Sequence, residues 1–339
     1  MVICAKVERK KAEKVRRQLA AKGIFDGSYI PKRDGKFVYF ALKRGTKTEL
    51  KTVEKRLEKR KRQGRTLAEE LKSKLSRKEA DELVGSFDIV GDIAVVEIPA
   101  RLVKKQKIIA NAIMRMHRNV KVVAKKTGGT SGQFRIRPVK PIAGEKRTCT
   151  VCRENNCEFE VDLNKAYFTP RLGTERQRIA NLVKPAEHVL VPFAGVGPFA
   201  IKIGKREKKA KVAGIELNKD AFLFFKRNIE RNKCENVFAV LGDVAHVLPG
   251  EYLDWANRVA MPLPKDSHTF LVNVLPCLKK KGMLHYYSFA DSSKPYQKAE
   301  KEVKEAAEKL GRKAKVVFRR LVRPYSKSTV QIVIDAEIL

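Results

Sequence analysis

A glycine-containing segment between two apolar runs decides the fold of this chain: Glu187-His188-Val189-Leu190-Val191-Pro192-Phe193-Ala194-Gly195-Val196-Gly197-Pro198-Phe199-Ala200. The apolar run Val189–Val191 predicts a short buried strand. Residues 193–197 form a glycine turn, and Pro198 stands where a helix would begin, because the first helical N–H needs no partner. Glycines let a ligand approach the backbone, and a helix N-terminus offers free N–H groups, so the segment predicts a nucleotide-type pocket.

The next two predicted strands end in acidic residues. The segment Lys211–Glu216 places a carboxylate about 20 residues beyond the glycines, where related folds bind ribose hydroxyls. The strand Val237–Leu241 is followed by Gly242 and Asp243. Either acid alone could be a solvated residue at a strand end, but together they favour the mononucleotide half of a doubly wound sheet. The turn is neither G-x-G-x-x-G nor a P-loop, which favours S-adenosylmethionine as the ligand.

Composition predicts a protein of several domains that binds nucleic acid and keeps its cysteines as reduced thiols. A chain of 339 residues predicts two or three domains. Lys and Arg number 74 against 38 acids, and the net charge of +36 predicts a polyanionic partner, with nucleic acid first. A salt-adapted or heat-stable proteome would also raise Lys, but Glu should then rise with it. No apolar run is long enough for a membrane span, no signal peptide is recognisable, and six irregularly spaced cysteines predict the cytoplasm.

The N-terminal half shows three segments. Residues 1–43 predict a small β-α-β-β domain, best explained as a docking element, and residues 44–84 predict a basic helical linker. Whether that linker contacts RNA or is only a solvated tether stays open. Residues 85–150 predict a middle α+β, RNA-binding domain in which 133–137 alternates like a strand.

Three clustered cysteines raise the question of a zinc site. A structural zinc site needs four ligands, whereas only Cys149, Cys152 and Cys157 cluster, and His188 and Cys234 do not have ligand spacing. We therefore expect free thiols and no metal.

The segment Tyr167–Arg176 precedes the glycine-turn strand. Thr169 is a suitable N-cap and Pro170 a suitable first helical residue. Arg171 and Glu175 are then four positions apart, on one helix face. A surface ion pair would explain that spacing fully, so the spacing alone assigns neither residue a function.

Several motifs in order carry a resemblance to a known family. They are Phe87–Ala94, Arg153–Cys157, Tyr167–Arg176, Phe193–Phe199 and Val322–Ser326. Together they resemble the archaeal and eukaryotic tRNA (guanine-37, N1)-methyltransferase family over about residues 85–339. Residues 1–43 resemble it only in size and β-α-β-β pattern.

The resemblance implies a three-part protein that methylates N1 of the guanosine 3′ of the anticodon. The expected fold class is α/β, a class I methyltransferase (Rossmann-like) doubly wound sheet over residues 151–339, with two smaller α+β N-terminal domains. The implied cofactor is S-adenosyl-L-methionine, and the implied partner is the anticodon loop and body of tRNA. We expect a monomer that needs neither a membrane nor a metal.

By motif, Glu175 would be the general base that removes the N1 proton, and Arg135 would stabilise charge on the guanine O6. The resemblance implies tRNA contacts at Tyr167, Arg171 and Arg176. The implied cofactor-binding residues are Phe193, Ala194, Gly195, Val196, Gly197, Pro198, Glu216, Leu217, Asp243 and Val244.

Two positions depart from the family pattern. Val191 replaces an acid two residues before Phe193, which removes a cofactor contact. Pro262, Leu263 and Pro264 stand where the family has Asn-Leu-Pro, so an amide that would contact the target base is missing. Backbone carbonyls near Pro262 and Leu263 can still serve this purpose.

Other functions remain open. A wyosine-pathway enzyme on the same tRNA position could also methylate a tricyclic guanosine derivative, and it would share nearly all these motifs. A relative that transfers the aminocarboxypropyl group should lack the base and its arginine. A non-catalytic RNA-binding protein with a degenerate methyltransferase fold would also tolerate Val191 and Pro262.

Overall fold

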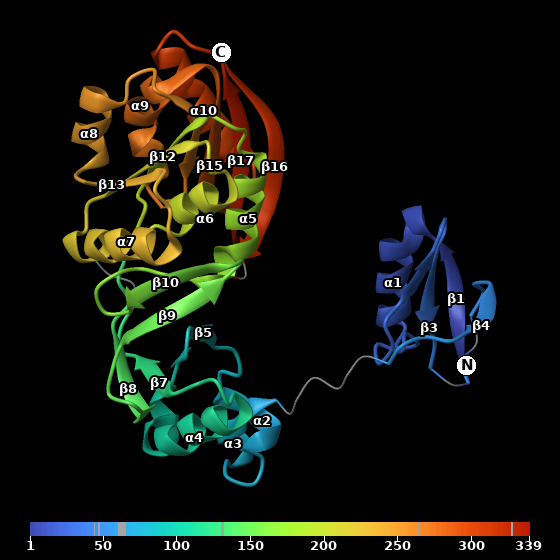
Figure 1. Ribbon diagram of the computed structural model, residues 1–339. Helices are drawn as coiled ribbons and strands as arrows, with labels where there is room; N and C mark the ends of the chain where they lie inside the picture. Colours follow the sequence, from blue (N-terminus) through green and yellow to red (C-terminus); the bar gives the residue numbers. More distant parts are fainter. Residues whose placement is uncertain (44, 47, 60–65, 130–131, 264, 327) are drawn as a thin grey trace. The chain divides into compact units, whose positions relative to one another are not determined.

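The computed structural model describes residues 1–43, 45–46, 48–59, 66–129, 132–263, 265–326 and 328–339 (Figure 1). The chain divides into two compact units, Met1–Glu70 and Leu71–Leu339. None of the helices in the described ranges is long and apolar enough to cross a membrane.

The first unit is an antiparallel sheet covered on one face by a helix (Figure 1). Its strands lie in the order β2, β3, β1, β4, with bounds Lys32–Asp34, Phe37–Ala41, Val2–Glu8 and Thr52–Lys55. The helix α1 (Ala12–Ala21) buries Leu19 against Ala5 and Phe40. The predicted β-α-β-β pattern is present.

Part of the segment predicted as a linker belongs to this sheet. Strand β4 pairs with β1, so that Val53 lies opposite Cys4. Lys55 holds β4 further, because its ammonium group lies 2.9 Å from Asp34 and over the ring of Tyr39. Two short helices follow, α2 (Leu67–Glu70) and α3 (Arg77–Glu82). Strand pairing therefore continues beyond residue 43, into the segment 44–84.

A four-stranded sheet opens the second unit. Its order is β5, β6, β7, β8, with bounds Asp88–Val90, Ile93–Val96, Val122–Lys126 and Val139–Gly144. A 3₁₀ turn (Ala100–Lys105) and helix α4 (Gln106–Met116) join the parallel pair β6 and β7. The prediction of a strand over 133–137 is wrong: Gln133–Arg135 form a turn, and Arg135 adopts a left-handed φ of 55°.

A hairpin connects this sheet to the C-terminal part. Its strands are β9 (Cys149–Glu154) and β10 (Cys157–Asp162). Two asparagines of helix α7 (Lys219–Asn232) bond both backbone groups of β10 residues: Asn228 bonds Glu160, and Asn232 bonds Glu158. These bonds anchor the hairpin to the C-terminal sheet's helical layer.

The C-terminal part is built on a seven-stranded sheet in the order β13, β12, β11, β14, β15, β17, β16. Five strands are parallel, and β17 runs antiparallel to both of its neighbours. The chain leaves β11 in one direction to β12 and β13 and then returns to its other side for β14. The strand bounds are β11 His188–Pro192, β12 Lys211–Glu216, β13 Val237–Leu241, β14 Ala256–Met261, β15 Leu278–Asp291, β16 Ala314–Pro324 and β17 Thr329–Ile338.

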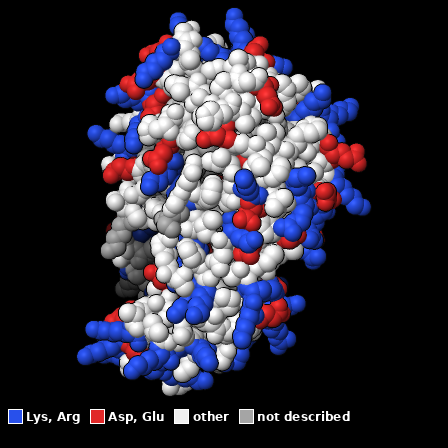
Figure 2. All heavy atoms as spheres, turned by 90° about the vertical axis from the view of Figure 1, so that its left-hand side faces the viewer, with Lys and Arg blue, Asp and Glu red and all other residues white. Residues whose placement is uncertain are grey.

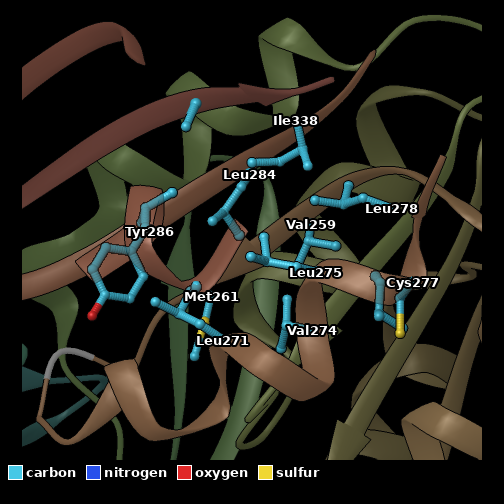
Figure 3. Close-up of a cluster of buried hydrophobic side chains, with 14 of the residues drawn as sticks. Val259, Met261, Leu271, Val274, Leu275, Cys277, Leu278, Leu284, Tyr286 and Ile338 are labelled. Carbon is cyan, nitrogen blue, oxygen red and sulfur yellow. The ribbon is translucent and has the colours of Figure 1, made fainter. Parts of the chain in front are cut away.

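Apolar layers cover both faces of this sheet. One face packs with α8 (Val244–Glu251), α9 (Leu271–Val274) and α10 (Gln297–Lys309). Figure 3 shows side chains of β14, β15 and α9, such as Met261, Leu284 and Leu271, converging there. The other face packs with α5 (Gly173–Leu182), α6 (Pro198–Arg206) and α7. The predicted α/β class with a doubly wound sheet is confirmed.

Candidate active site

The glycine turn lies where the strand order reverses, beyond the carboxyl end of β11. Helix α6 begins at Pro198, as predicted, and Gly197 precedes it with a φ of 87°. A Cβ atom at Gly197 would lie 2.1 Å from the ring of Phe225. Only glycine therefore fits between the turn and α7. Ligands of such sheets bind in this crevice.

Glu216 faces the glycine turn from the end of β12. Its carboxylate accepts hydrogen bonds from the backbone N–H groups of Gly195, at 2.7 Å, and Asn218, at 2.8 Å. Burial raises the pKa of this carboxyl above its usual range. A half-buried carboxylate beside a glycine turn is a suitable acceptor for the ribose hydroxyls of S-adenosylmethionine.

The second acid, Asp243, has a structural partner as well. It is the N-cap of α8 and accepts a hydrogen bond from Ala245 N–H at 2.8 Å. Its neighbour Val244 is buried in the core, and Leu217 is half-buried after Glu216. Asp243 and Glu216 end adjacent strands, since Leu241 lies opposite Glu216. The structure thus brings both acids to one edge of the sheet.

The segment before α5 is fastened beside the turn. Asn218 donates a hydrogen bond to the carbonyl of Lys165 at 2.8 Å, and the Tyr167 carbonyl lies next to Gly195. The Tyr167 side chain is 47% exposed. Thr169 caps the following 3₁₀ turn through Arg171 N–H, as predicted. Tyr167 is therefore an exposed ring at the rim of the glycine-turn crevice.

Arg171 and Glu175 have different partners, so a mutual ion pair does not explain their spacing. Arg171 Nε donates to Asp88 Oδ1 at 2.6 Å, which ties the segment to the first sheet of the second unit. Glu175 points inward and is only 2% exposed. A solvated helix face is therefore excluded for Glu175.

The two oxygens of Glu175 differ in their surroundings. Oε2 accepts hydrogen bonds from Arg178 Nε, at 2.8 Å, and from the Tyr287 hydroxyl, at 3.1 Å. Oε1 lies 3.1 Å from an Arg320 guanidinium nitrogen but makes no hydrogen bond. Burial and the neighbouring Glu175 charge raise the pKa of Tyr287 well above 10, so its hydroxyl stays a donor. One carboxylate oxygen is saturated, and the other is not.

Arg135 reaches the same region from the turn that follows β7. Its guanidinium lies 6.0 Å from the centre of the Phe289 ring, and that ring packs against Tyr325 at 4.4 Å. Tyr287 and Phe289 are two residues apart on β15, on one face of the sheet. The two predicted catalytic residues therefore approach neighbouring positions on one strand.

The remaining predicted tRNA-contacting residues differ in accessibility. Arg176 is 2% exposed and bonds Glu154 with two nitrogens, at 2.7 and 2.5 Å, as well as the Thr169 carbonyl. Its guanidinium binds these two partners inside the protein, so this geometry supports a structural role. Pro262 and Leu263 follow β14 and are half-buried, whereas Pro264 lies outside the described residues.

Val191 and the clustered cysteines belong to apolar surroundings. Val191 belongs to β11 and is buried in the apolar layer that this strand shares with α6. Burial raises the pKa of the Cys149, Cys152 and Cys157 thiols. In the part of the chain that the structure describes, no three His, Cys, Asp or Glu side chains are grouped as a metal site requires.

Sequence reasoning missed the groups that hold Glu175. They are Arg178, Tyr287, Arg320 and Asp335. Arg178 lies three positions after Glu175 on a helix, which is a usable signal for contact. The other three come from distant strands, and only the fold brings them to the site.

Basic side chains are spread over the second unit. Figure 2 shows Lys and Arg crowding the lower end of one face, at the height where Figure 1 labels α3 and α4. Exposed residues in and around α4 include Lys104 in the preceding 3₁₀ turn, Lys107 in the helix, and Arg118 and Lys121 after it. Such a surface suits a phosphate backbone.

Comparisons with known proteins place the chain in a family. The TRM5/TYW2 methyltransferase domain matches residues 150–317, the TYW2 N-terminal domain 67–148, and the tRNA methyltransferase 5 N-terminal domain 4–48. The tRNA (guanine(37)-N(1))-methyltransferase Trm5b of Pyrococcus abyssi is 37% identical over 99% of this chain and 98% of its own length.

Solved structures agree with this match. The crystal structure of Trm5b from Pyrococcus abyssi has a TM-score of 0.74 at 36% identity, covering 100% of this chain and 99% of that one. A structure of aTrm5 in complex with tRNALeu has a TM-score of 0.72 at 30% identity, covering 99% of this chain and 100% of that one. The resemblance drawn from the sequence motifs is confirmed: this chain belongs to the Trm5/TYW2 methyltransferase family.

Proposed function

We propose that this chain transfers a methyl group from S-adenosylmethionine to N1 of guanosine 37 in tRNA. The observation that carries the proposal is the position of Glu175. Its carboxylate is buried, and one of its oxygens makes no hydrogen bond. It contacts Tyr287, next to Tyr286, which pairs with Met261 at the end of β14. Glu175 therefore lies at the same edge of the sheet as the glycine turn.

The chemistry needs a base and a countercharge. N1–H of guanine is a weak acid, and Glu175 takes its proton. Negative charge then grows on O6, where the Arg135 guanidinium stabilises it. When bound, S-adenosylmethionine supplies an electrophilic methyl group on a sulfonium. N1 forms its bond to the methyl carbon as the carbon–sulfur bond breaks, and S-adenosylhomocysteine leaves.

The cofactor would occupy the crevice at the glycine turn. Glu216 accepts the ribose hydroxyls, and Asp243 faces the adenine end. The turn itself, residues 193–198, and the half-buried Leu217 line the rest. The half-buried Glu216 carboxylate beside Gly195 N–H supports this placement, because a charge-assisted acceptor there is already oriented.

The tRNA contacts rest on exposed and fixed groups around that crevice. A base inside a folded loop must be flipped out and stacked to react. The exposed ring of Tyr167 suits stacking, and Arg171 is held by Asp88. The carbonyls of Pro262 and Leu263 are placed after β14 to accept from the base. Arg176 positions this segment through Glu154.

We assign a role to each part of the chain. The sheet of the first unit docks on the tRNA away from the anticodon, and the sheet of β5–β8 binds the anticodon region. The C-terminal part performs the transfer, and a monomer suffices. The match of residues 4–48 to the tRNA methyltransferase 5 N-terminal domain supports the docking role.

A second candidate is methylation of a tricyclic wyosine precursor at the same tRNA position. The match of residues 67–148 to the TYW2 N-terminal domain favours keeping it. Aminocarboxypropyl transfer is less well supported, because Glu175 and Arg135 both occupy the site. A degenerate, non-catalytic protein would not need a buried carboxylate with an oxygen that makes no hydrogen bond.

Methylation of tRNA transcripts tests the proposal. We expect radiolabelled methyl transfer to a transcript with G37 and none to the same transcript with A37, and nuclease mapping should find N1-methylguanosine. Transfer only to a tRNA that carries the tricyclic precursor would replace this proposal with the second candidate.

A single variant tests the role of Glu175. Glu175→Gln keeps the shape but cannot take the proton, so the single-turnover rate should fall about 100-fold or more. Cofactor affinity should stay unchanged. Glu230→Gln, an exposed acid on α7, is the control and should keep the full rate. An unchanged rate in Glu175→Gln would contradict the base assignment.

A further inference from the structure

Glu175 is the end of a chain of buried charged groups. Its neighbour Arg178 holds both carboxylate oxygens of Asp335, at 2.6 and 3.2 Å. Asp335 lies 2.7 Å from His285 Nδ1, and His285 Nε2 lies 2.8 Å from an Arg258 nitrogen. These residues come from α5, β17, β15 and β14, and His285 and Asp335 are almost completely buried. This series of hydrogen-bonded side chains connects Glu175, the proposed base, to the centre of the sheet.

The hydrogen-bond directions along this chain are fixed by its ends. A guanidinium can only donate, so His285 Nε2 must accept from Arg258. His285 Nδ1 then carries the proton and donates to Asp335. Burial lowers the pKa of His285, which agrees with a neutral ring. Asp335 is therefore left as an ionised, immobile acceptor for Arg178.

A fixed Arg178 determines which oxygen of Glu175 is available. Asp335 takes the two terminal nitrogens of the guanidinium, and this aims Nε at Oε2 of Glu175. The Tyr287 hydroxyl, from strand β15 beneath α5, donates to the same oxygen. Oε2 thus has two donors, whereas Oε1 has only the Arg320 cation nearby. Arg320 lies on the edge strand β16, and its side chain is 40% exposed.

We propose that Arg178 and Tyr287, held by Asp335, are positioning residues that select Oε1 of Glu175 as the proton-accepting oxygen. This inference rests on the proposed function. Both donors favour the ionised carboxylate and stop it from rotating, so Oε1 meets N1–H while Oε2 stays bonded. The groups that face Glu175 are Arg178 on α5, Tyr287 on β15 and Arg320 on β16.

Tyr287→Phe tests the positioning role, and the preceding residue, Tyr286, provides a matched control. Without the hydroxyl, the ionised form of Glu175 loses one of its two hydrogen-bond donors. The acid limb of the single-turnover methylation rate should move to higher pH, and the rate at neutral pH should fall roughly tenfold. Tyr286→Phe removes an equally buried hydroxyl that donates to Glu302 on the opposite face. Its acid limb should not move.

A second variant keeps the test informative if Tyr287→Phe folds poorly. Arg178→Lys retains the charge but cannot hold Asp335 and Glu175 together, so it should lower the maximal rate with little effect on KM for tRNA. Asp335→Asn should act in the same direction through Arg178. Cofactor affinity, measured by calorimetry, should be that of the unmodified protein in every folded variant.

The outcomes distinguish failure of the proposed function from failure of the positioning role. If the unmodified chain does not methylate G37, the proposed function fails. If it does, and Glu175→Gln is inactive while Tyr287→Phe and Arg178→Lys keep the original pH profile and rate, the positioning role alone is overturned. A shifted acid limb in Tyr287→Phe, absent in Tyr286→Phe, supports it, because a merely structural loss would move both variants alike.

Discussion

Tyr287 and Phe289 project from one face of β15, and each contacts one residue of the proposed catalytic pair. The Tyr287 hydroxyl donates to Glu175, and the Phe289 ring packs beneath the Arg135 guanidinium. Glu175 comes from helix α5, whereas Arg135 comes from a turn in the preceding sheet. A single strand thus contacts both residues of the proposed catalytic pair.

The glycine turn should tolerate no side chain at Gly197. Its φ of 87° strains any other residue, and an alanine Cβ would lie 2.1 Å from the Phe225 ring. We expect Gly197→Ala to destabilise the fold by about 2–4 kcal/mol and to weaken S-adenosylmethionine binding. Urea denaturation and calorimetry measure these effects. Gly250→Ala, which meets open space in α8, is the control and should cost nothing.

Cofactor affinity should depend on pH through Glu216. Burial raises the pKa of this carboxyl, so it takes up a proton at a higher pH than an exposed glutamate does. The ionised form is the better acceptor for ribose hydroxyls. Affinity should therefore be full above the raised pKa and fall as the pH drops through it.

Calorimetric titration from about pH 4 to about pH 8, which extends upward from the usual glutamate range, checks this dependence. Glu216→Gln should bind more weakly at every pH and show a flatter profile, because the amide cannot be protonated there. A Glu216→Gln protein that keeps both the affinity and the pH dependence of the unmodified chain would remove Glu216 from the cofactor site.

Local patterns predicted three neighbouring strands of the methyltransferase sheet, β11, β12 and β13. Each of the patterns used spans only a few residues. They are the apolar run Val189–Val191, the acid at the end of Lys211–Glu216 and Pro198 at a helix start. Each has a local cause, in side-chain burial or in capping. The glycine turn between β11 and α6 could therefore be predicted from the sequence alone.

The surroundings of Glu175 could not be predicted in that way. A spacing of four suggested a surface pair with Arg171, whereas Arg171 bonds Asp88, 83 positions away. Phe134 and Ile136 alternate with arginines as in a strand, but Arg135 turns the chain with a positive φ and packs on Phe289. Such contacts depend on the tertiary fold and leave no periodic trace.

The buried pair of Arg176 and Glu154 should matter for stability more than for RNA binding. Arg176→Lys loses the two-pronged bond and leaves a buried carboxylate poorly paired, which should cost about 3–5 kcal/mol. Arg153→Lys changes an exposed pair with Glu158 and should cost less than about 1 kcal/mol. Thermal unfolding compares the two. A stable Arg176→Lys with much weaker tRNA binding would instead point to direct contact.

Binding to tRNA should weaken steeply as salt rises, because phosphate contacts release counterions. Lys104→Gln and Lys107→Gln remove exposed charges of the middle sheet's helical face. Each should lower the slope of log affinity against log salt by about one if it contacts a phosphate. Lys309→Gln, at the end of α10, is the control. Equal slopes for all three variants would place the anticodon-region contact elsewhere.

Substitutions of Arg135 and Glu175 should have non-additive effects on the methylation rate. In the proposed mechanism both act on one transition state, in which the proton leaves N1 as charge grows on O6. Arg135→Ala should therefore slow single-turnover methylation of G37 tRNA about 100-fold. The double variant Arg135→Ala/Glu175→Gln should be little slower than the worse single variant, because once one group is gone the other has less to stabilise.

Phe289→Leu, which removes the ring beneath Arg135, should weaken the arginine's effect but leave that of Glu175 intact. Fully additive losses would mean that the two residues work in separate steps, with Arg135 binding tRNA and taking no part in the transfer.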